Sequence, residues 1–147
     1  MREWNGVTVA YDLDRFVEAQ ASSYAAALGE LRAGAKRSHW MWFVFPQVAG
    51  LGRSATAQHY AISGPAEARA YLAHPVLGPR LLESARALTG LDTTDPVRVF
   101  GSVDAQKLQS SMTLFAAVSD DPVFTEVLDQ YFAGVPDPGT TSRLSPA

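Results

Sequence analysis

Apolar residues recur at intervals of three and four along most of the chain, which is the spacing of a helix with one buried face. The first such run follows Asp14, which we expect to cap a helix that ends at Gly34. Its apolar positions are Leu13, Phe16, Val17, Tyr24, Ala27, Leu28 and Leu31. Gln20 falls in the middle of this apolar face. Because a buried amide needs partners, Gln20 either ties two elements together or faces a polar cavity.

A dense aromatic segment follows, with two tryptophans and two phenylalanines within residues 40–45. Large aromatic side chains dominate core burial, so the segment lies largely inside the protein. Its edges are polar: Lys36 and His39 precede it, and Gln47 follows Pro46. The segment therefore reads as the wall of a pocket. Its nearly continuous apolar character fits a strand or a helix, and the helical neighbours favour a helix capped by Ser38.

Glycine and proline divide the rest of the chain into shorter helices. Asn5-Gly6 is a turn signal, and residues 7–11 are too few to predict an element. We expect helices over residues 54–62, 65–73, 76–89, 102–118 and 122–133, with a short apolar piece at 97–100. In the helix opened by Pro65, Ala66 is expected inside and Glu67 outside. The fold class is thus all-α, a compact single domain of six or seven helices over residues 1–134, with residues 135–147 as a frayed or draped tail.

The helix after Ser102 places polar residues on its apolar side. On a helical wheel Asp104, Lys107 and Ser111 share a face with Leu108 and its apolar neighbours, while Gln106, Gln109 and Thr113 face solvent. A buried carboxylate and ammonium must pair or line a cavity that admits water or ligand. Each residue alone has a structural interpretation, since an acid favours the first turn, a lysine can reach the surface, and a serine is small.

Composition limits the classes of function. The chain has 147 residues, 47% hydrophobic content and a net charge of -3, which suits one globular domain. It has no basic run, so we expect neither nucleic acid nor membrane as a partner. The absence of cysteine removes thiolate chemistry, and the three histidines lack metal-ligand spacing. No cofactor or metal is indicated, and a soluble, cytoplasmic protein is expected.

Several strings of residues carry a family resemblance that covers nearly the whole chain. They are Arg15-Phe16…Gln20, Lys36…Ser38-His39-Trp40-Met41-Trp42-Phe43…Phe45-Pro46-Gln47, Gly50-Leu51-Gly52-Arg53-Ser54, His74-Pro75-Val76-Leu77-Gly78…Arg80-Leu81 and Phe100-Gly101…Asp104…Lys107-Leu108…Ser110-Ser111-Met112-Thr113-Leu114-Phe115. The sequence resembles the helical family called domain of unknown function 1810, whose members are often labelled calpastatin-like. The resemblance implies an all-helical domain and no established activity.

A partial resemblance links the chain to the NADAR (NAD- and ADP-ribose-associated) domain, whose members cleave N-glycosidic bonds of ribosyl compounds. It lies in the Lys-x-x-x-Ser-Met string that begins at Lys107, in Phe124 and Leu128, and in Gly134 followed by Asp137 and Thr140. This resemblance implies a ribosyl compound as the ligand.

Three functions are compatible with these patterns, and each treats the aromatic segment differently. In the first, Trp40 and Trp42 stack a base while Lys36 and Arg53 hold phosphate, with Gln20, Gln47 and Ser111 also lining the pocket. Asp104 then stabilises an oxocarbenium-like centre or orients water, and His39 or Lys107 supplies a proton for hydrolysis of an N-glycosidic bond. In the second, the same pocket binds a small molecule without chemistry, since glycosidases usually employ two carboxylates. In the third, the aromatic segment is core and the polar residues form an internal network for a structural or partner-binding role.

Overall fold

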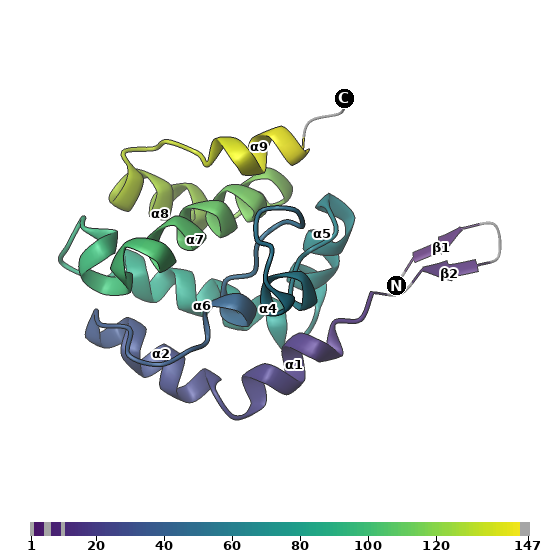
Figure 1. The fold of residues 1–147 in the computed structure, drawn as a ribbon, viewed down its shortest axis with the longest axis horizontal. Helices are drawn as coiled ribbons and strands as arrows, with labels where there is room; N and C mark the ends of the chain where they lie inside the picture. The colour runs from purple at the N-terminus through teal and green to yellow at the C-terminus, as the bar shows by residue number, and fades with distance from the viewer. Residues whose placement is uncertain (1, 5–6, 10, 145–147) are drawn as a thin grey trace.

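Helix α6 (Leu77–Thr89) and helix α7 (Pro96–Val118) together contact most of the other helices of the fold (Figure 1). The computed structural model describes residues 2–4, 7–9 and 11–144. Within them the elements are β1 (Arg2–Trp4), β2 (Val7–Val9), α1 (Asp14–Ala21), α2 (Tyr24–Ala33), α3 (Met41–Val44), α4 (Ala55–His59), α5 (Pro65–Ala73), α6 (Leu77–Thr89), α7 (Pro96–Val118), α8 (Val123–Phe132) and α9 (Pro138–Leu144). Helix α7 contacts α5, α8 and α9, and α6 contacts α2, α3, α5 and α8.

The prediction of a helical protein is confirmed, but the described residues form nine helices, not six or seven. One extra helix arises because the run from Asp14 to Gly34 breaks at Ser22 and Ser23. Serine side chains compete for backbone hydrogen bonds and favour helix ends, whereas the apolar spacing continues across the break and hides it. Asp14 is the first residue of α1 and not its cap, and α2 ends as predicted at Gly34, with φ 72°.

The second extra helix is α9, which lies in the segment predicted to be a frayed or draped tail. It packs on α7, and its Thr140 is fully buried. Its Arg143 donates a hydrogen bond of 2.9 Å to the carbonyl of Gly50. Residues 138–144 therefore belong to the packed body, where the sequence alone indicated no regular structure.

Strands β1 and β2 pair antiparallel, with Arg2 opposite Val9 and Trp4 opposite Val7. The turn predicted at Asn5-Gly6 lies outside the described residues, and no element was predicted at residues 7–11. None of the helices in the described part of the chain is long and apolar enough to cross a membrane.

The orientation predicted for α5 is wrong at its start, because Glu67 is buried and Ala66 is exposed. The Glu67 carboxylate lies 3.0 Å from the guanidinium of Arg15 and accepts a hydrogen bond from the backbone of Ser63. Arg15 also donates to the carbonyls of residues 59 and 61. This ion pair joins α1 to the α4–α5 segment. The hydrogen bonds to backbone groups offset the cost of removing the Glu67 carboxylate and the Arg15 guanidinium from water.

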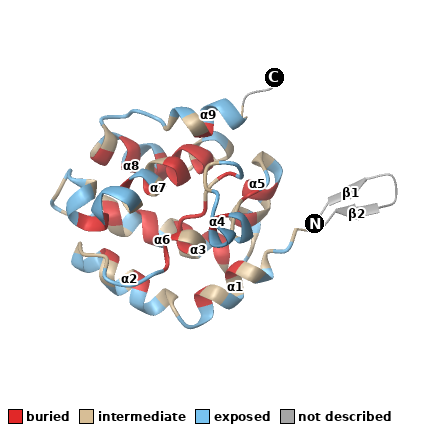
Figure 2. Ribbon diagram, in the orientation of Figure 1, coloured by how far each residue is buried: buried red, intermediate tan, exposed pale blue. Residues whose placement is uncertain are grey.

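Helix α7 has a discontinuity at Gly101, where φ is 79°. Asp95 caps the first part, and the second part begins at Ser102, as the sequence predicted for the helix of residues 102–118. The prediction that Thr113 faces solvent is wrong. Thr113 is buried because α9 covers that side of α7, and its hydroxyl accepts a hydrogen bond from the backbone N–H of Asp137. Figure 2 shows the buried positions facing inward between α5, α6, α7 and α8.

A close backbone contact between α5 and α6 gives a test of this packing. A Cβ atom on Gly78 would lie 2.0 Å from the carbonyl oxygen of Leu72, whereas a Cβ on Gly29 in α2 would meet nothing within 4 Å. We expect Gly78→Ala to lower the free energy of unfolding by about 2 kcal/mol because the two helices must separate. The control Gly29→Ala should raise it by about 0.5–1 kcal/mol, since alanine favours the helix. Urea denaturation measures both, and equal effects of the two substitutions would contradict the packing described here.

Candidate functional site

The aromatic segment forms α3 and its flanks, and it leaves the rings of Trp42 and Phe43 partly exposed while burying those of Trp40 and Phe45. It is helical as predicted, although α3 is only four residues long and begins after Trp40, not at Ser38. Trp40 and Phe45 are almost fully buried, whereas Trp42 is half-buried. The segment is therefore core on one side and open wall on the other.

Glu30 of α2 holds the chain that leads into α3. Its carboxylate accepts hydrogen bonds from the backbone N–H groups of Arg37 and Ser38, the Ser38 hydroxyl and the indole of Trp40, at 2.6–3.0 Å. Desolvation by itself would raise the pKa of the Glu30 carboxyl, but these donors outweigh it and lower the pKa to about 2. The position of α3 thus depends on an ionised carboxylate.

Asp104 brings both lysines of the chain to one place. Its two carboxylate oxygens lie 2.9 Å from the Lys36 ammonium and 3.2 Å from the Lys107 ammonium. The three side chains are only 8–20% exposed. Burial would raise the pKa of Asp104, but the hydrogen bonds and charges of the two lysines outweigh it, and the pKa lies below its ordinary value. Asp104 is ionised at neutral pH, and the cluster of two ammonium groups and one carboxylate carries one positive charge.

Each lysine of this cluster also lies against one tryptophan. The Lys107 ammonium is 3.8 Å from the ring centroid of Trp42, and the Lys36 ammonium is 5.1 Å from that of Trp40. A cation over an indole face is attracted by the ring quadrupole. Lys36 further donates to the carbonyl of Ser38 at 2.6 Å. Lys36 is therefore held by the Asp104 carboxylate, the Ser38 carbonyl and the Trp40 ring. Lys107 also lines the larger of the two hollows described next.

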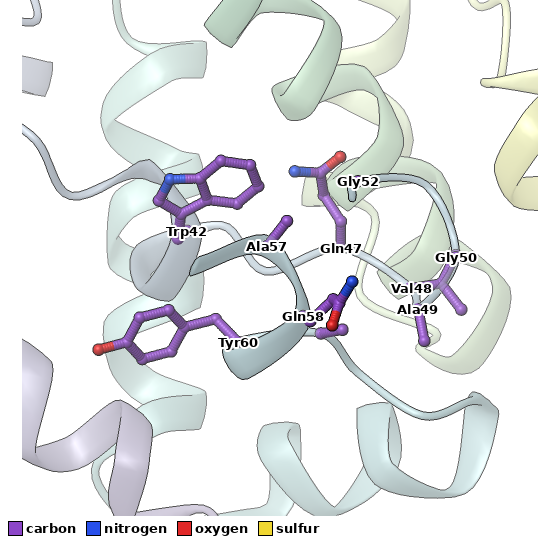
Figure 3. Close-up of a pocket in the computed structure, with 10 residues that line it drawn as sticks. Trp42, Gln47, Val48, Ala49, Gly50, Gly52, Ala57, Gln58 and Tyr60 are labelled. Atoms are coloured by element: carbon purple, nitrogen blue, oxygen red, sulfur yellow. The ribbon is translucent and has the colours of Figure 1, made fainter. Parts of the chain in front are cut away.

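Two hollows meet at the Trp42 ring. The smaller, of about 130 Å³, is lined by Trp42, Gln47, Val48, Ala49, Gly50, Gly52, Ala57, Gln58, Tyr60 and Ala61. Figure 3 shows the Trp42 and Tyr60 rings on either side of Ala57, with the amides of Gln47 and Gln58 nearby. This hollow is mostly apolar, with amide groups at one end.

The larger hollow, of about 370 Å³, is the more polar of the two. It is lined by Trp42, Gln47, Leu51, Gly52, Val103, Gln106, Lys107, Gln109, Ser110, Asp137 and Gly139. Trp42, Gln47 and Gly52 belong to both hollows, so the two are adjacent. An apolar slot with amides beside a polar chamber with an ammonium suits a ligand that has a flat ring at one end and an anionic group at the other.

Some of the predicted site residues gather here and others lie elsewhere. Trp42, Gln47 and Lys107 line the hollows, and Lys36, Trp40 and Asp104 support them from behind. Ser111 is fully buried and has no hydrogen-bond partner within the described residues. His39 and Arg53 are exposed and line neither hollow.

Gln20 is buried as predicted but serves a separate network. Its amide donates to the carbonyl of Phe43 at 2.7 Å and to the Tyr71 hydroxyl at 3.0 Å, and it accepts from Arg80 at 3.4 Å. Burial raises the pKa of Tyr71, which keeps its hydroxyl protonated as a donor to the Phe43 carbonyl. Gln20 therefore ties α1 to α3, α5 and α6 and lines neither hollow.

Sequence reasoning missed four residues that shape the site. Glu30 supports α3, Gln58 and Tyr60 line the smaller hollow, and Asp137 lines the larger one. Asp137 was noticed only through the partial NADAR resemblance. No group of three or more histidine, aspartate or glutamate side chains in the described residues is arranged to hold a metal ion.

Fold and site together define a predominantly helical protein with a tryptophan-walled hollow that Lys107 lines. The family model described as a protein of unknown function, DUF1810, matches residues 10–144, and the chain belongs to that family. The structure is similar to the crystal structure of the conserved hypothetical protein Rv1873 from Mycobacterium tuberculosis, with 47% sequence identity and a TM-score of 0.91. The match covers 93% of this chain and 99% of that chain. No curated protein matches the sequence.

The Glu30 anchor predicts a specific dependence of stability on pH. Its folded pKa of about 2 lies below the ordinary 4.5, so its stabilising effect is complete above pH 4.5 and is lost as the pH falls toward 2. We expect Glu30→Gln to lower the free energy of unfolding by about 1–2 kcal/mol at pH 7. The difference from wild type should shrink below pH 4.5.

Denaturant unfolding across this pH range measures the effect. Glu18→Gln is the matched control, because Glu18 is exposed and makes no such contacts. The role assigned to the carboxylate would be contradicted if the free energies of unfolding of wild type and Glu30→Gln differed by the same amount from pH 7 to pH 2.

Proposed function

We propose that the two hollows form one binding site for a nucleotide or another ribosyl phosphate. The observation that carries this proposal is the position of Lys107, which lines the polar hollow and whose ammonium lies over the Trp42 ring. Asp104 neutralises only one of the two lysines, so one positive charge remains beside the hollow. A partly desolvated ammonium with an incomplete set of acceptors favours an anionic ligand group.

The smaller hollow suits the base of such a ligand. Trp42, Tyr60 and Ala57 provide apolar surface, and aromatic rings stack on bases of any sequence with about 1–3 kcal/mol per base. The amide of Gln47 makes no hydrogen bond within the described residues and is half-buried, so it is available for the polar edge of a base.

Direct titration tests this function. The probes are AMP, ADP-ribose and NAD, measured by calorimetry and by thermal shift. We expect saturable binding that Lys107→Met weakens by about tenfold or more, because a hydrogen bond to a charged group is lost. Arg69→Ala removes an exposed cation of α5 and should leave the affinity unchanged.

The lysine content permits a second readout of the same titration. Lys36 and Lys107 are the only lysines, so ¹³C-methylation of amines labels these two side chains and the N-terminus. Ligand should shift the resonance that disappears in Lys107→Met. Absence of saturable binding of all three probes would contradict the proposed function.

Hydrolysis of an N-glycosidic bond is the second candidate function, and the pairing of Lys107 with Asp104 favours it. Water would form a bond to the anomeric carbon as the carbon–nitrogen bond breaks. A neutral leaving base would take a proton from Lys107, and the proton released by water would return to the lysine amine. Nicotinamide, whose ring nitrogen is already cationic in NAD, would leave as the neutral molecule without that proton, and the proton released by water would pass to solvent. The ionised Asp104, 3.2 Å from that ammonium, would offset positive charge at the anomeric carbon. The partial resemblance to the NADAR domain supports the same chemistry.

Asp104→Asn distinguishes this candidate from simple binding. With NAD as the probe, we expect nicotinamide release to fall by about 100-fold or more, because a fixed charge is removed. The substitution should also cost about 2 kcal/mol of stability, since two partly buried lysines lose their counter-charge. Chromatography of released nicotinamide and urea denaturation measure the two effects. If wild type releases no nicotinamide while binding the probes, hydrolysis is excluded for this substrate and binding stands.

A further inference from the structure

Asp137 is one of three aspartates that precede a proline at the start of a helix, and it differs from the other two in its surroundings. Asp95 caps α7 and is exposed, and Asp121 pairs with Arg86 at 3.0 Å. Asp137 instead lies on the wall of the polar hollow that Lys107 also lines. The same local sequence therefore has a different role before α9.

The carboxylate of Asp137 is held in place and only partly used. Its Oδ2 atom accepts hydrogen bonds from the backbone N–H and the hydroxyl of Thr140, at 2.9 and 2.6 Å. Within the described residues its Oδ1 atom accepts no hydrogen bond, and no lysine or arginine forms an ion pair with the carboxylate. One oxygen fixes the group and the other remains free as an acceptor.

The chain around Asp137 is also fixed to α7. The backbone N–H of Asp137 donates to the Thr113 hydroxyl at 2.9 Å, and the Gln109 amide donates to the carbonyl of Val135 at 2.9 Å. Thr140 itself is fully buried. A side chain held by such neighbours keeps its geometry when a ligand arrives, and this reduces the entropy cost of binding.

We infer that Asp137 accepts a hydrogen bond from a ribose hydroxyl and makes the site selective for ribonucleotides over 2′-deoxyribonucleotides. A carboxylate accepts hydrogen bonds and repels phosphate, whereas the ammonium of Lys107 attracts phosphate. The two groups on one hollow therefore orient a ligand with its phosphate toward Lys107 and its hydroxyl donors toward Asp137. Ribose hydroxyls are donors that protein carboxylates bind in this way. The inference rests on the proposed function, because it concerns the same site.

The test compares AMP with 2′-deoxy-AMP in calorimetric titrations of the full chain. Wild type should bind AMP about tenfold or more tightly than 2′-deoxy-AMP, since a hydrogen bond to a charged acceptor is lost with the hydroxyl. Asp137→Asn should reduce this ratio to within about twofold of unity, because asparagine still caps a helix but is uncharged. Asp137→Ser, another capping residue, should do the same, and it provides a second folded variant. Asp95→Asn is the matched control and should keep the wild-type ratio.

The outcomes separate the two proposals. If wild type binds both nucleotides equally, or if Asp137→Asn and Asp137→Ser keep the wild-type ratio, the role of Asp137 is overturned while the nucleotide site stands. If wild type binds neither nucleotide, this inference fails, and the proposed function fails with it when ADP-ribose and NAD do not bind either. A reduced ratio in both Asp137 variants, with Asp95→Asn unchanged and circular dichroism showing intact helices, confirms the assignment.

Discussion

The structure depends on one electrostatic arrangement, the Asp104 carboxylate held between the only two lysines of the chain. In a partly buried ion cluster of this kind, the partners of each charge offset the free-energy cost of removing it from water. Lys36 comes from the α2–α3 connection and Lys107 from α7, so the cluster also joins the aromatic segment to α7. The remaining positive charge lies beside the Trp42 ring, in a protein whose net charge is -3.

The Gln20 network and the Arg15–Glu67 network are closed, and the walls of the two hollows differ from them in this respect. Gln20 has partners on three helices, and the Arg15–Glu67 pair is completed by backbone groups. Such satisfied networks fix the relative positions of helices. At the hollows, the side-chain amide of Gln47 and the Oδ1 atom of Asp137 make no hydrogen bond within the described residues. A polar group on a cavity wall that lacks a hydrogen-bond partner in the protein is available to a ligand, whereas a group with all its partners holds the fold together.

Helix α9 and the 48–52 loop form part of the wall of the site. Arg143 of α9 bonds the carbonyl of Gly50, and Gly139 lies against Leu51. The polar hollow therefore exists only when the C-terminal segment is packed on α7. A fold of this kind supports many functions, and the chemistry of the hollow, not the helical architecture, is the basis for the function proposed.

Local features of the sequence were sufficient for much of the fold. Apolar spacing, capping residues and glycine stops predicted the helices near residues 76–89 and 102–118, because these signals act within a few turns of chain. The helical wheel also predicted correctly that Asp104 and Lys107 turn toward the interior. Tertiary structure decided the rest: Glu30 beside the aromatic segment, Gln20 away from the hollows, Thr113 beneath α9, and Asp137 on the same hollow as Lys107. Those contacts join residues far apart in the sequence, and no periodicity within one element specifies which other element will cover it.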